Sequence, residues 1–201
     1  MTLRKVEEPG DGAVRRILSL YEEAFPSDER IPSQLVCEHL AGSTHFELLE
    51  CLEDGRFVGF AMLDAIELRP GWMVGLLLYL AVLSELRGHG LGETAYRCIW
   101  ARFEEKARRE GMRFGGLLYE VERPELAGTE QERALRTRRL EFYRRLGGAP
   151  LEGIDYVQPA LNQDKKPVRL HLVFHPSRSC PEMTCAEIHR EFMRQAWDID
   201  P

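Results

Sequence analysis

The sequence predicts one α/β domain in which a mixed sheet of seven strands is flanked by helices and followed by an extra C-terminal helix. Short segments with alternating or continuous apolar residues are typical of strands, and segments with apolar residues every three or four positions are typical of helices. The 201 residues suffice for one sizeable core. Since neither an internal repeat nor a linker interrupts the chain, we expect a single domain over residues 1–201.

The first part of the chain predicts a short strand and two helices. The strand covers residues 3–6 and is followed by a turn rich in proline and glycine. Apolar residues at helical spacing predict a helix over residues 14–25, which Pro26 ends. Ser33 is a suitable N-cap for a second, shorter helix over residues 33–42.

The middle of the chain changes to a strand pattern. Residues 46–52 and 57–63 predict a hairpin, because Asp54 and Gly55 between them tolerate the positive φ angles of a tight turn. Residues 73–82 are almost continuously apolar, which predicts a strand buried on both faces.

The second half continues with helices and strands in alternation. Thr184 and Glu187 have the spacing of a capping box, and the apolar residues Ile188, Phe192, Ala196 and Trp197 predict a face of the last helix that must be buried. The expected elements are a helix from Leu91 closed by Gly111, a strand over 114–121, a helix ended by Gly147, strands over 151–157 and 168–174, and a final helix over 185–197.

Composition limits the partners and the compartment. A formal net charge of −6 argues against a nucleic-acid-binding protein, because such binding depends on Lys and Arg neutralising phosphates. The N-terminus has no apolar core of a signal peptide, and no apolar run reaches the ~18 residues of a membrane span. Five cysteines without a disulfide rhythm indicate a reducing compartment. We therefore expect a cytoplasmic protein that binds neither nucleic acid nor a membrane.

A metal site is not expected. The histidines and cysteines near the C-terminus match no standard zinc spacing, and no neighbouring residue marks a cysteine as an activated nucleophile. The side chains considered were His171, His175, Cys180, Cys185 and His189.

A glycine-rich segment joins the buried strand to the helix that follows it. Such a turn can hold a phosphate, because the first turn of a helix has unpaired N–H groups and partial positive charge. A dinucleotide fingerprint would need a glycine where Glu93 stands, and a Walker loop would need Gly-Lys-Ser/Thr, which is absent. The pattern that remains is R-x-x-G-x-G, formed by Arg87, Gly90 and Gly92.

This pattern resembles motif A of the GNAT acetyltransferases, (Q/R)-x-x-G-x-(G/A). The preceding segment 79–86 is similar to the family's lead-in, and residues 138–147 are similar to its FY-x-x-x-G segment near the coenzyme thiol. The resemblance covers about residues 3–175 and implies a GNAT-like, mostly antiparallel sheet, with residues 176–201 as an extension. One departure is Gly148-Ala149, where the family commonly has Gly-Phe.

The resemblance also implies a co-substrate and its site. The family binds acetyl-CoA, whose pantetheine arm pairs with the strand end as a further strand would, and whose pyrophosphate is wrapped by the glycine-rich turn. The backbone N–H of Val82 then donates to the thioester carbonyl, where negative charge grows during transfer. The expected cofactor-binding residues are Leu80, Ala81, Val82, Arg87, Gly88, His89, Gly90, Leu91 and Gly92.

Acetylation of an amine needs a base for the amine proton and an acid for the departing thiolate. Tyr143 matches the family tyrosine near the coenzyme sulfur and is the acid candidate; the alternative is a tyrosine that completes a helix face. Glu120 is the base candidate, because a carboxylate in an apolar strand is costly unless it faces a polar cleft, and burial would raise its pKa. Glu122 is the second choice. A solvated strand end and a base acting through water are the alternatives.

The sequence therefore predicts an acetyl-CoA-dependent N-acetyltransferase that transfers the acetyl group directly in a ternary complex. The rival interpretation is a non-catalytic module that binds acyl-CoA as a sensor or interaction domain. The acceptor is left open between a small amine and a peptide amine, and a longer acyl donor remains an alternative. Glu29 is a candidate contact for a cationic acceptor. The last helix packs either on its own chain or on a second protomer in a homodimer.

Overall fold

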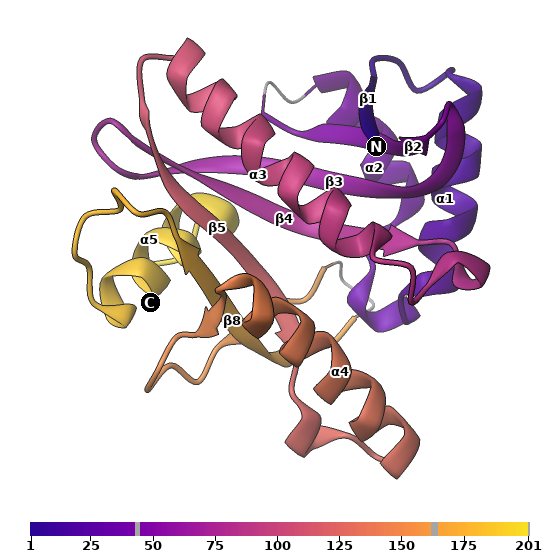
Figure 1. Cartoon of the computed structure of the whole chain (residues 1–201). Coiled ribbons are helices and arrows are strands. Elements are labelled where there is room, and N and C mark those ends of the chain that lie inside the picture. Colours follow the sequence, from indigo (N-terminus) through magenta and orange to yellow (C-terminus); the bar gives the residue numbers. More distant parts are fainter. Residues whose placement is uncertain (43–44, 162–164, 201) are drawn as a thin grey trace. The chain divides into compact units, whose positions relative to one another are not determined.

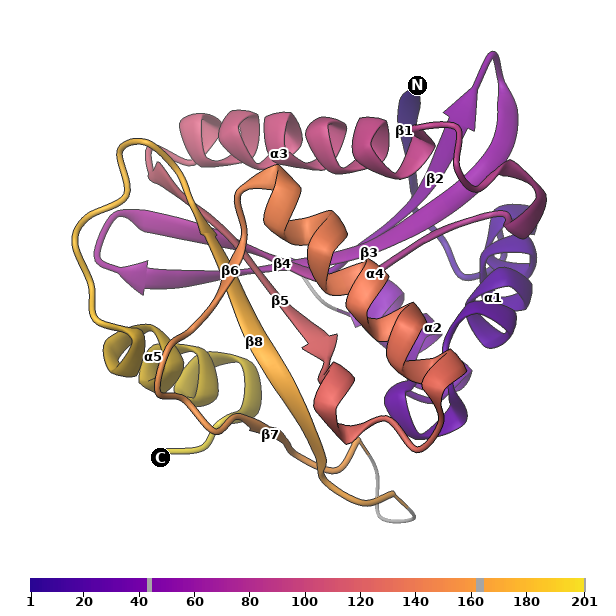
Figure 2. The same cartoon turned by 60° about the horizontal axis from the view of Figure 1, so that its bottom comes forward.

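The computed structural model describes residues 1–42, 45–161 and 165–200. In this part of the chain five α-helices accompany eight strands, whose hydrogen-bonded order is β1-β2-β3-β4-β5-β8-β6, with β7 also paired to β8 (Figures 1 and 2). Strands β4 and β5 are parallel, whereas β1 with β2, β2 with β3, and β8 with its three partners are antiparallel. The sheet is therefore mixed and mostly antiparallel, as expected. None of the helices in the described ranges is long and apolar enough to cross a membrane.

The chain forms two compact units, each with its own set of elements. The first contains residues 1–65, 77–105 and 160–166, as far as these are described. Its elements are β1 (Thr2–Val6), α1 (Gly12–Ala24), α2 (Ser33–Gly42), β2 (Glu47–Glu53), most of β3 (Arg56–Arg69), the end of β4 (Trp72–Val82) and most of α3 (Leu91–Arg109).

Helices cover both faces of the strands in the first unit. One apolar cluster joins α1 and α2 to inward residues of the sheet such as Leu48, Phe60 and Met62. A second cluster joins Cys51 and Val58 on the other face to α3 (Figure 2). Side chains of these strands are thus buried on both faces of the sheet, which explains the apolar character of residues 46–52 and 57–63. The predicted hairpin with its Asp54-Gly55 turn is confirmed.

A buried carboxylate fastens α1 to the edge of the first unit. Glu50 on β2 is only 1% exposed and accepts hydrogen bonds from Arg4 at 2.8 Å and from Arg16 on α1 at 2.7 Å. Asp11 caps α1 by accepting from the Ala13 N–H at 2.8 Å. Pairing with two guanidinium groups offsets the cost of removing the charge of Glu50 from water.

The second unit contains residues 66–76, 106–159 and 167–201, of which residue 201 lies outside the described ranges. The new elements are β5 (Arg113–Glu122), α4 (Glu130–Leu146), β6 (Ala149–Pro150), β7 (Val157–Gln158), β8 (Val168–Pro176) and α5 (Cys185–Trp197). The first residues of β4 pair in parallel with β5, and β5 pairs antiparallel with β8 from Gly116 opposite Pro176 to Glu122 opposite Leu170.

The seven-strand prediction is wrong at one place. Residues 151–156 form a turn and irregular chain, and two strands of two residues each, β6 and β7, flank them. A turn at Gly153 interrupts the segment, and Asp155 forms ion pairs with Arg123 at 2.9 Å and Arg169 at 3.2 Å. The turn therefore interrupts the pairing with β8 between β6 and β7.

Helix α5 packs on residues of its own unit. Its predicted capping box is confirmed, because Thr184 and Glu187 bond each other's backbone. The side-chain amide of Gln195 both accepts from the Glu67 N–H at 3.0 Å and donates to the Glu67 carbonyl at 2.6 Å. Ile188 and Phe192 are buried as expected, whereas Ala196 is exposed, contrary to the predicted apolar face. Met193 is buried in its place.

Candidate active site

The glycine-rich turn lies in the first unit, between the end of β4 and the start of α3. Gly88 and Gly90 have φ angles of +86° and +79°, which side chains rarely adopt. A short 3-10 turn, η2 (Ser84–Leu86), precedes them. Arg87 folds back so that its Nε donates to the Val82 carbonyl at 3.3 Å. The turn is thus built as the sequence pattern predicted.

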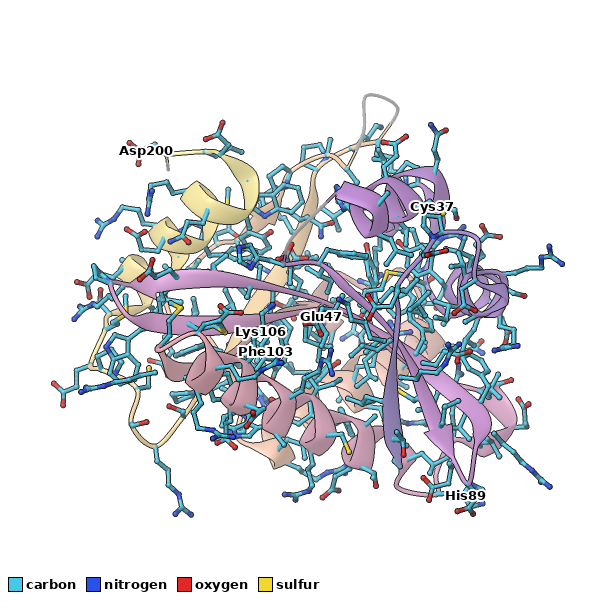
Figure 3. All side chains as sticks on the ribbon, turned by 90° about the horizontal axis from the view of Figure 1, so that it is seen from above. Cys37, Glu47, His89, Phe103, Lys106 and Asp200 are labelled. Atoms are coloured by element: carbon cyan, nitrogen blue, oxygen red, sulfur yellow. The ribbon has the colours of Figure 1, made fainter. Side chains whose placement is uncertain are left out.

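The start of α3 presents unpaired donors toward the same turn. The first helical bond runs from the Thr94 N–H to the Gly90 carbonyl at 3.0 Å, so the N–H groups of Leu91 and Gly92 precede the hydrogen-bond ladder. Residues 87–90 are exposed, and His89 lies at the outer edge of the ribbon (Figure 3). A Cβ added at Gly88 or Gly90 would meet open space, which leaves room for an anion against the backbone.

The last residues of β4 differ from its beginning. Residues 73–77 are buried, but residues 78–80 and Val82 are partly exposed, so the expected burial on both faces holds only for the first half. Ala81 is buried, and its carbonyl lies directly against Gly59 of β3, where a Cβ would collide with it. The segment Leu80–Val82 is therefore fixed in place and yet accessible.

The loop between α1 and α2 is fastened from three sides within the first unit. The Tyr79 hydroxyl on β4 donates to the Glu29 carbonyl at 2.9 Å and accepts from the Ile31 N–H at 3.3 Å. The Tyr21 hydroxyl donates to the Ile31 carbonyl at 3.1 Å, and its ring lies 4.8 Å from that of Tyr79. Lys165 donates to the carbonyls of Ser27 and Arg30. These bonds hold the backbone beside Glu29 in one conformation.

In the second unit Glu120 occupies a polar cluster on β5. Its carboxylate accepts a hydrogen bond from the Tyr156 hydroxyl and one from the Gln158 amide at 2.7 Å. Burial raises the pKa of Glu120, and the two hydrogen bonds act against that rise. The side chain keeps a small accessible surface. The expectation that Glu120 faces a polar environment with a raised pKa therefore agrees with this geometry.

Glu122 is engaged differently. Its carboxylate forms an ion pair with Arg139 on α4 and is 9% exposed. This ion pair distinguishes Glu122 from Glu120, whose carboxylate is hydrogen-bonded by uncharged groups. Arg136 on the same helix donates to the Arg123 carbonyl at 3.2 Å. Two arginines of α4 thus have structural partners within the second unit.

Tyr143 lies on α4 with its ring against β5. Its ring centroid is 4.3 Å from that of Tyr119, the residue next to Glu120, and the ring is half-buried. Thr129 caps the helix by accepting from the Glu132 N–H at 3.2 Å, and Gly147 ends it with φ of +107°. The structure therefore brings Tyr143 next to the strand that carries Glu120.

Comparison with known families decides the assignment. A family model described as the acetyltransferase (GNAT) family matches residues 14–124, more than half of the chain. The chain belongs to the GNAT family. The matched segment includes the glycine-rich turn of this GNAT chain and ends just after Glu122. A search of curated proteins finds no match.

Solved structures share the fold of this GNAT chain at low sequence identity. A Bacteroides thetaiotaomicron protein described as a GNAT-family acetyltransferase is 18% identical, with a TM-score of 0.74 over 99% of both chains. Arabidopsis thaliana NAA60, solved with acetyl-CoA, is 13% identical, with a TM-score of 0.58 over 86% of this chain and 97% of that one. Arabidopsis thaliana Naa50, solved with a bisubstrate analogue, is 15% identical, with a TM-score of 0.53 over 87% and 98%.

Two residues of the Glu120 cluster were missed by sequence reasoning. Tyr156 lies within residues 151–157, where a strand was expected, and Gln158 follows directly after them; both fall outside the segment that the family model matches. The available signal was the pair of polar groups at alternate positions on either side of Val157. It gave no indication of Glu120 as the partner, because that contact joins residues 36 and 38 positions apart.

Proposed function

We propose that this GNAT chain is an N-acetyltransferase that transfers the acetyl group of acetyl-CoA directly to an amine. The observation that carries the proposal is the Arg87–Gly92 turn, in which two glycines at positive φ face open space directly before the N-terminus of α3. This geometry fits the pyrophosphate of a coenzyme A molecule. Family membership supports the same donor.

The end of β4 is suited to the pantetheine arm. Val82 is partly exposed, and Gly59 leaves room for the Ala81 carbonyl at a place that a Cβ would occupy. In our proposal the Val82 N–H donates to the thioester carbonyl oxygen. A donor held rigidly where negative charge develops contributes more than a mobile one, because it needs no reorganisation during the reaction.

The chemistry needs one group that takes a proton and one that gives it. Acetyl-CoA supplies the acetyl group as a thioester, whose C–S bond breaks as the N–C bond forms. Glu120 takes the proton that the amine nitrogen loses, and its raised pKa makes it a stronger base than an ordinary carboxylate. Tyr143 gives its phenolic proton to the coenzyme sulfur, and exchange with water returns both groups to their starting states.

The acceptor of the reaction is an amine on a small molecule or a peptide. Support comes from the α1–α2 loop, which Tyr79, Tyr21 and Lys165 hold in one conformation, as a specificity loop requires. Naa50 and NAA60 are related in fold, and the Naa50 complex holds a bisubstrate analogue. We infer a reducing, cytoplasmic location from the five cysteines, all of which are free thiols.

A binding and turnover experiment tests this function. Purified protein should bind acetyl-CoA in calorimetry and release free thiol when supplied with members of an amine panel. Gly90→Val should weaken acetyl-CoA binding roughly tenfold or more, ~1.4 kcal/mol, because the side chain fills the space of the pyrophosphate. Binding without thiol release across the panel would favour the non-catalytic acyl-CoA module instead.

Gly71→Val is the matched control for this test. Gly71 has the same φ of +79°, lies in an exposed turn and also faces open space, but it belongs to the β3–β4 hairpin. The two variants introduce similar backbone strain, so only Gly90→Val should lose affinity. Equal acetyl-CoA affinity for both variants would overturn the assignment of the phosphate loop.

A further inference from the structure

The hydroxyl that contacts Glu120 belongs to one of the most deeply buried side chains of the second unit. Tyr156 is 0% exposed, and burial is the main reason that its pKa is raised well above the ordinary value. The phenol therefore keeps its proton and donates it in the hydrogen bond to the Glu120 carboxylate. A donor of this kind both fixes the carboxylate and stabilises its charged form.

Two aromatic side chains of helix α5 pack against the ring of Tyr156. The ring centroid lies 5.8 Å from that of Phe192 and 5.9 Å from that of His189, both on α5. Residues 151–156 themselves are irregular, so the sheet alone does not orient the ring. The Tyr156 carbonyl accepts from the Leu170 N–H at 3.3 Å, which fixes the backbone but not the side chain. The rotamer of Tyr156 thus depends on the docked helix.

Gln158 supplies the second bond to the carboxylate. Its Nε2 donates to Glu120 at 2.7 Å, and its side chain is 5% exposed. The orientation of the amide is determined by the carboxylate, which can only accept. Glu120 is thus held at both oxygens by groups outside the segment that defines the family match.

We propose that Tyr156 is a positioning residue for Glu120 and that helix α5 forms part of the active site by holding Tyr156 in place. This inference rests on the proposed role of Glu120 as the base. The helix would then be more than a stabilising extension. Removing it would change the protonation of Glu120, which lies 65 positions before Cys185, the first residue of the helix.

The consequence for the pH dependence has a definite sign. The base must be ionised, so kcat/KM rises as the pH increases through the pKa of Glu120. Tyr156→Phe keeps the buried ring but removes the donor that favours the carboxylate, and therefore shifts this acidic limb to higher pH. Other titratable groups near the cluster are His189 on α5, His171 on β8, and the pair of Glu122 with Arg139 on α4. All four side chains are retained in the variant.

The experiment measures the titration of Glu120 directly as well as through activity. Carbon-13 NMR of the labelled glutamate carboxyl groups, with Glu120→Gln to assign the signal, gives the titration in the full chain. In Tyr156→Phe we expect the Glu120 signal and the acidic limb of kcat/KM to move to higher pH together. A Glu120 signal that titrates as in the unchanged protein would overturn the proposal.

Variants on α5 test the role of the helix. Phe192→Ala removes one contact to the Tyr156 ring and should shift the Glu120 signal in the same direction. Arg194→Ala is the matched control, because Arg194 is an exposed residue that pairs with Glu191 of the same helix, so the variant keeps the docking of α5 and the contacts of Tyr156. If the Glu120 signal titrated in Phe192→Ala as in the unchanged protein, the proposal that α5 is part of the active site would be wrong.

The same measurements separate this inference from the proposed function. If Glu120→Gln kept full turnover, Glu120 would not be the base, whereas the NMR titration would still report whether Tyr156 sets its protonation. Tyr96→Phe is a further control, because it deletes the hydroxyl of another buried tyrosine on α3, and it should leave the Glu120 signal unchanged.

Discussion

At the scale of single residues, a phenol that protonates a thiolate must be held rigidly within reach of the sulfur. The ring of Tyr143 lies against Tyr119, and the α4 helix is fixed at its C-terminal end by Gly147. Tyr143→Phe should keep this packing and lower turnover roughly 10²-fold, the scale of one general acid, with coenzyme affinity near that of the unchanged protein. Single-turnover kinetics with the best amine of the panel would measure it.

A second substitution separates the acid role of Tyr143 from its packing role. Tyr143→Leu also loses the contact between rings, so it should lower the melting temperature, whereas Tyr143→Phe should not. If the chemical step were unchanged in Tyr143→Phe, the residue would serve only to complete the helix face.

The residues of the site differ in how visible they are in the sequence. Glu120 could be found because a carboxylate inside an apolar strand needs a special environment, and Arg87 to Gly92 because glycines at a strand-to-helix turn have few structural uses. Tyr156 and Gln158 could not be found, because neither residue type is unusual near a strand. Their role depends on a long-range contact to Glu120 that no local pattern contains.

At the scale of elements, the helices and long strands follow from local rules. The capping residue Thr184 marks a helix start that the structure contains, and apolar periodicity locates the strands of the hairpin. The predicted strand over residues 151–157 failed, because a turn at Gly153 interrupts the segment between the short strands β6 and β7. Whether such a short segment forms a strand depends on its tertiary contacts more than on its intrinsic propensity.

Helix α5 gives the prediction at this scale. Ile188, Phe192 and Met193 are buried, and each contributes about 1.5–3 kcal/mol before the entropy of ordering the helix is subtracted. Deleting residues 182–201 should therefore lower the melting temperature clearly in differential scanning calorimetry. Light scattering on the truncated chain would show whether a homodimer is lost as well. An unchanged melting temperature and mass would mean that the helix contributes nothing to the fold.

At the scale of the whole molecule, β4 and β5 form the parallel pair of an otherwise antiparallel set of described pairings. The mixed sheet could be predicted from the order of helices and strands together with the family motif. The pairing of β8 with three partners could not, because strands of two residues such as β6 and β7 have no periodicity to detect. Whether the whole chain unfolds as one domain stays a prediction.

The free energy of unfolding of the whole chain depends on pH through groups whose pKa differs between the folded and the unfolded state. Burial lowers the pKa of His171, His175 and His189, all in the second unit, below their ordinary value of 6.5. The unfolded chain therefore binds more protons than the folded one as the pH falls through that value, and the free energy of unfolding decreases. The raised pKa of Glu120 acts in the opposite sense, because there the folded state holds the proton more tightly.

Three histidines against one carboxyl group give a net loss of stability between about pH 7 and pH 5. Hydrogen bonds also lower the pKa of Asp11 and Glu187, and their contribution disappears only at still lower pH. Calorimetric unfolding near pH 6 in buffers of different ionisation enthalpy should show net proton uptake, and the triple variant His171→Gln, His175→Gln, His189→Gln should abolish most of it. Net proton release on unfolding at this pH would mean that Glu120 dominates the balance and that the histidines are solvated in the folded state.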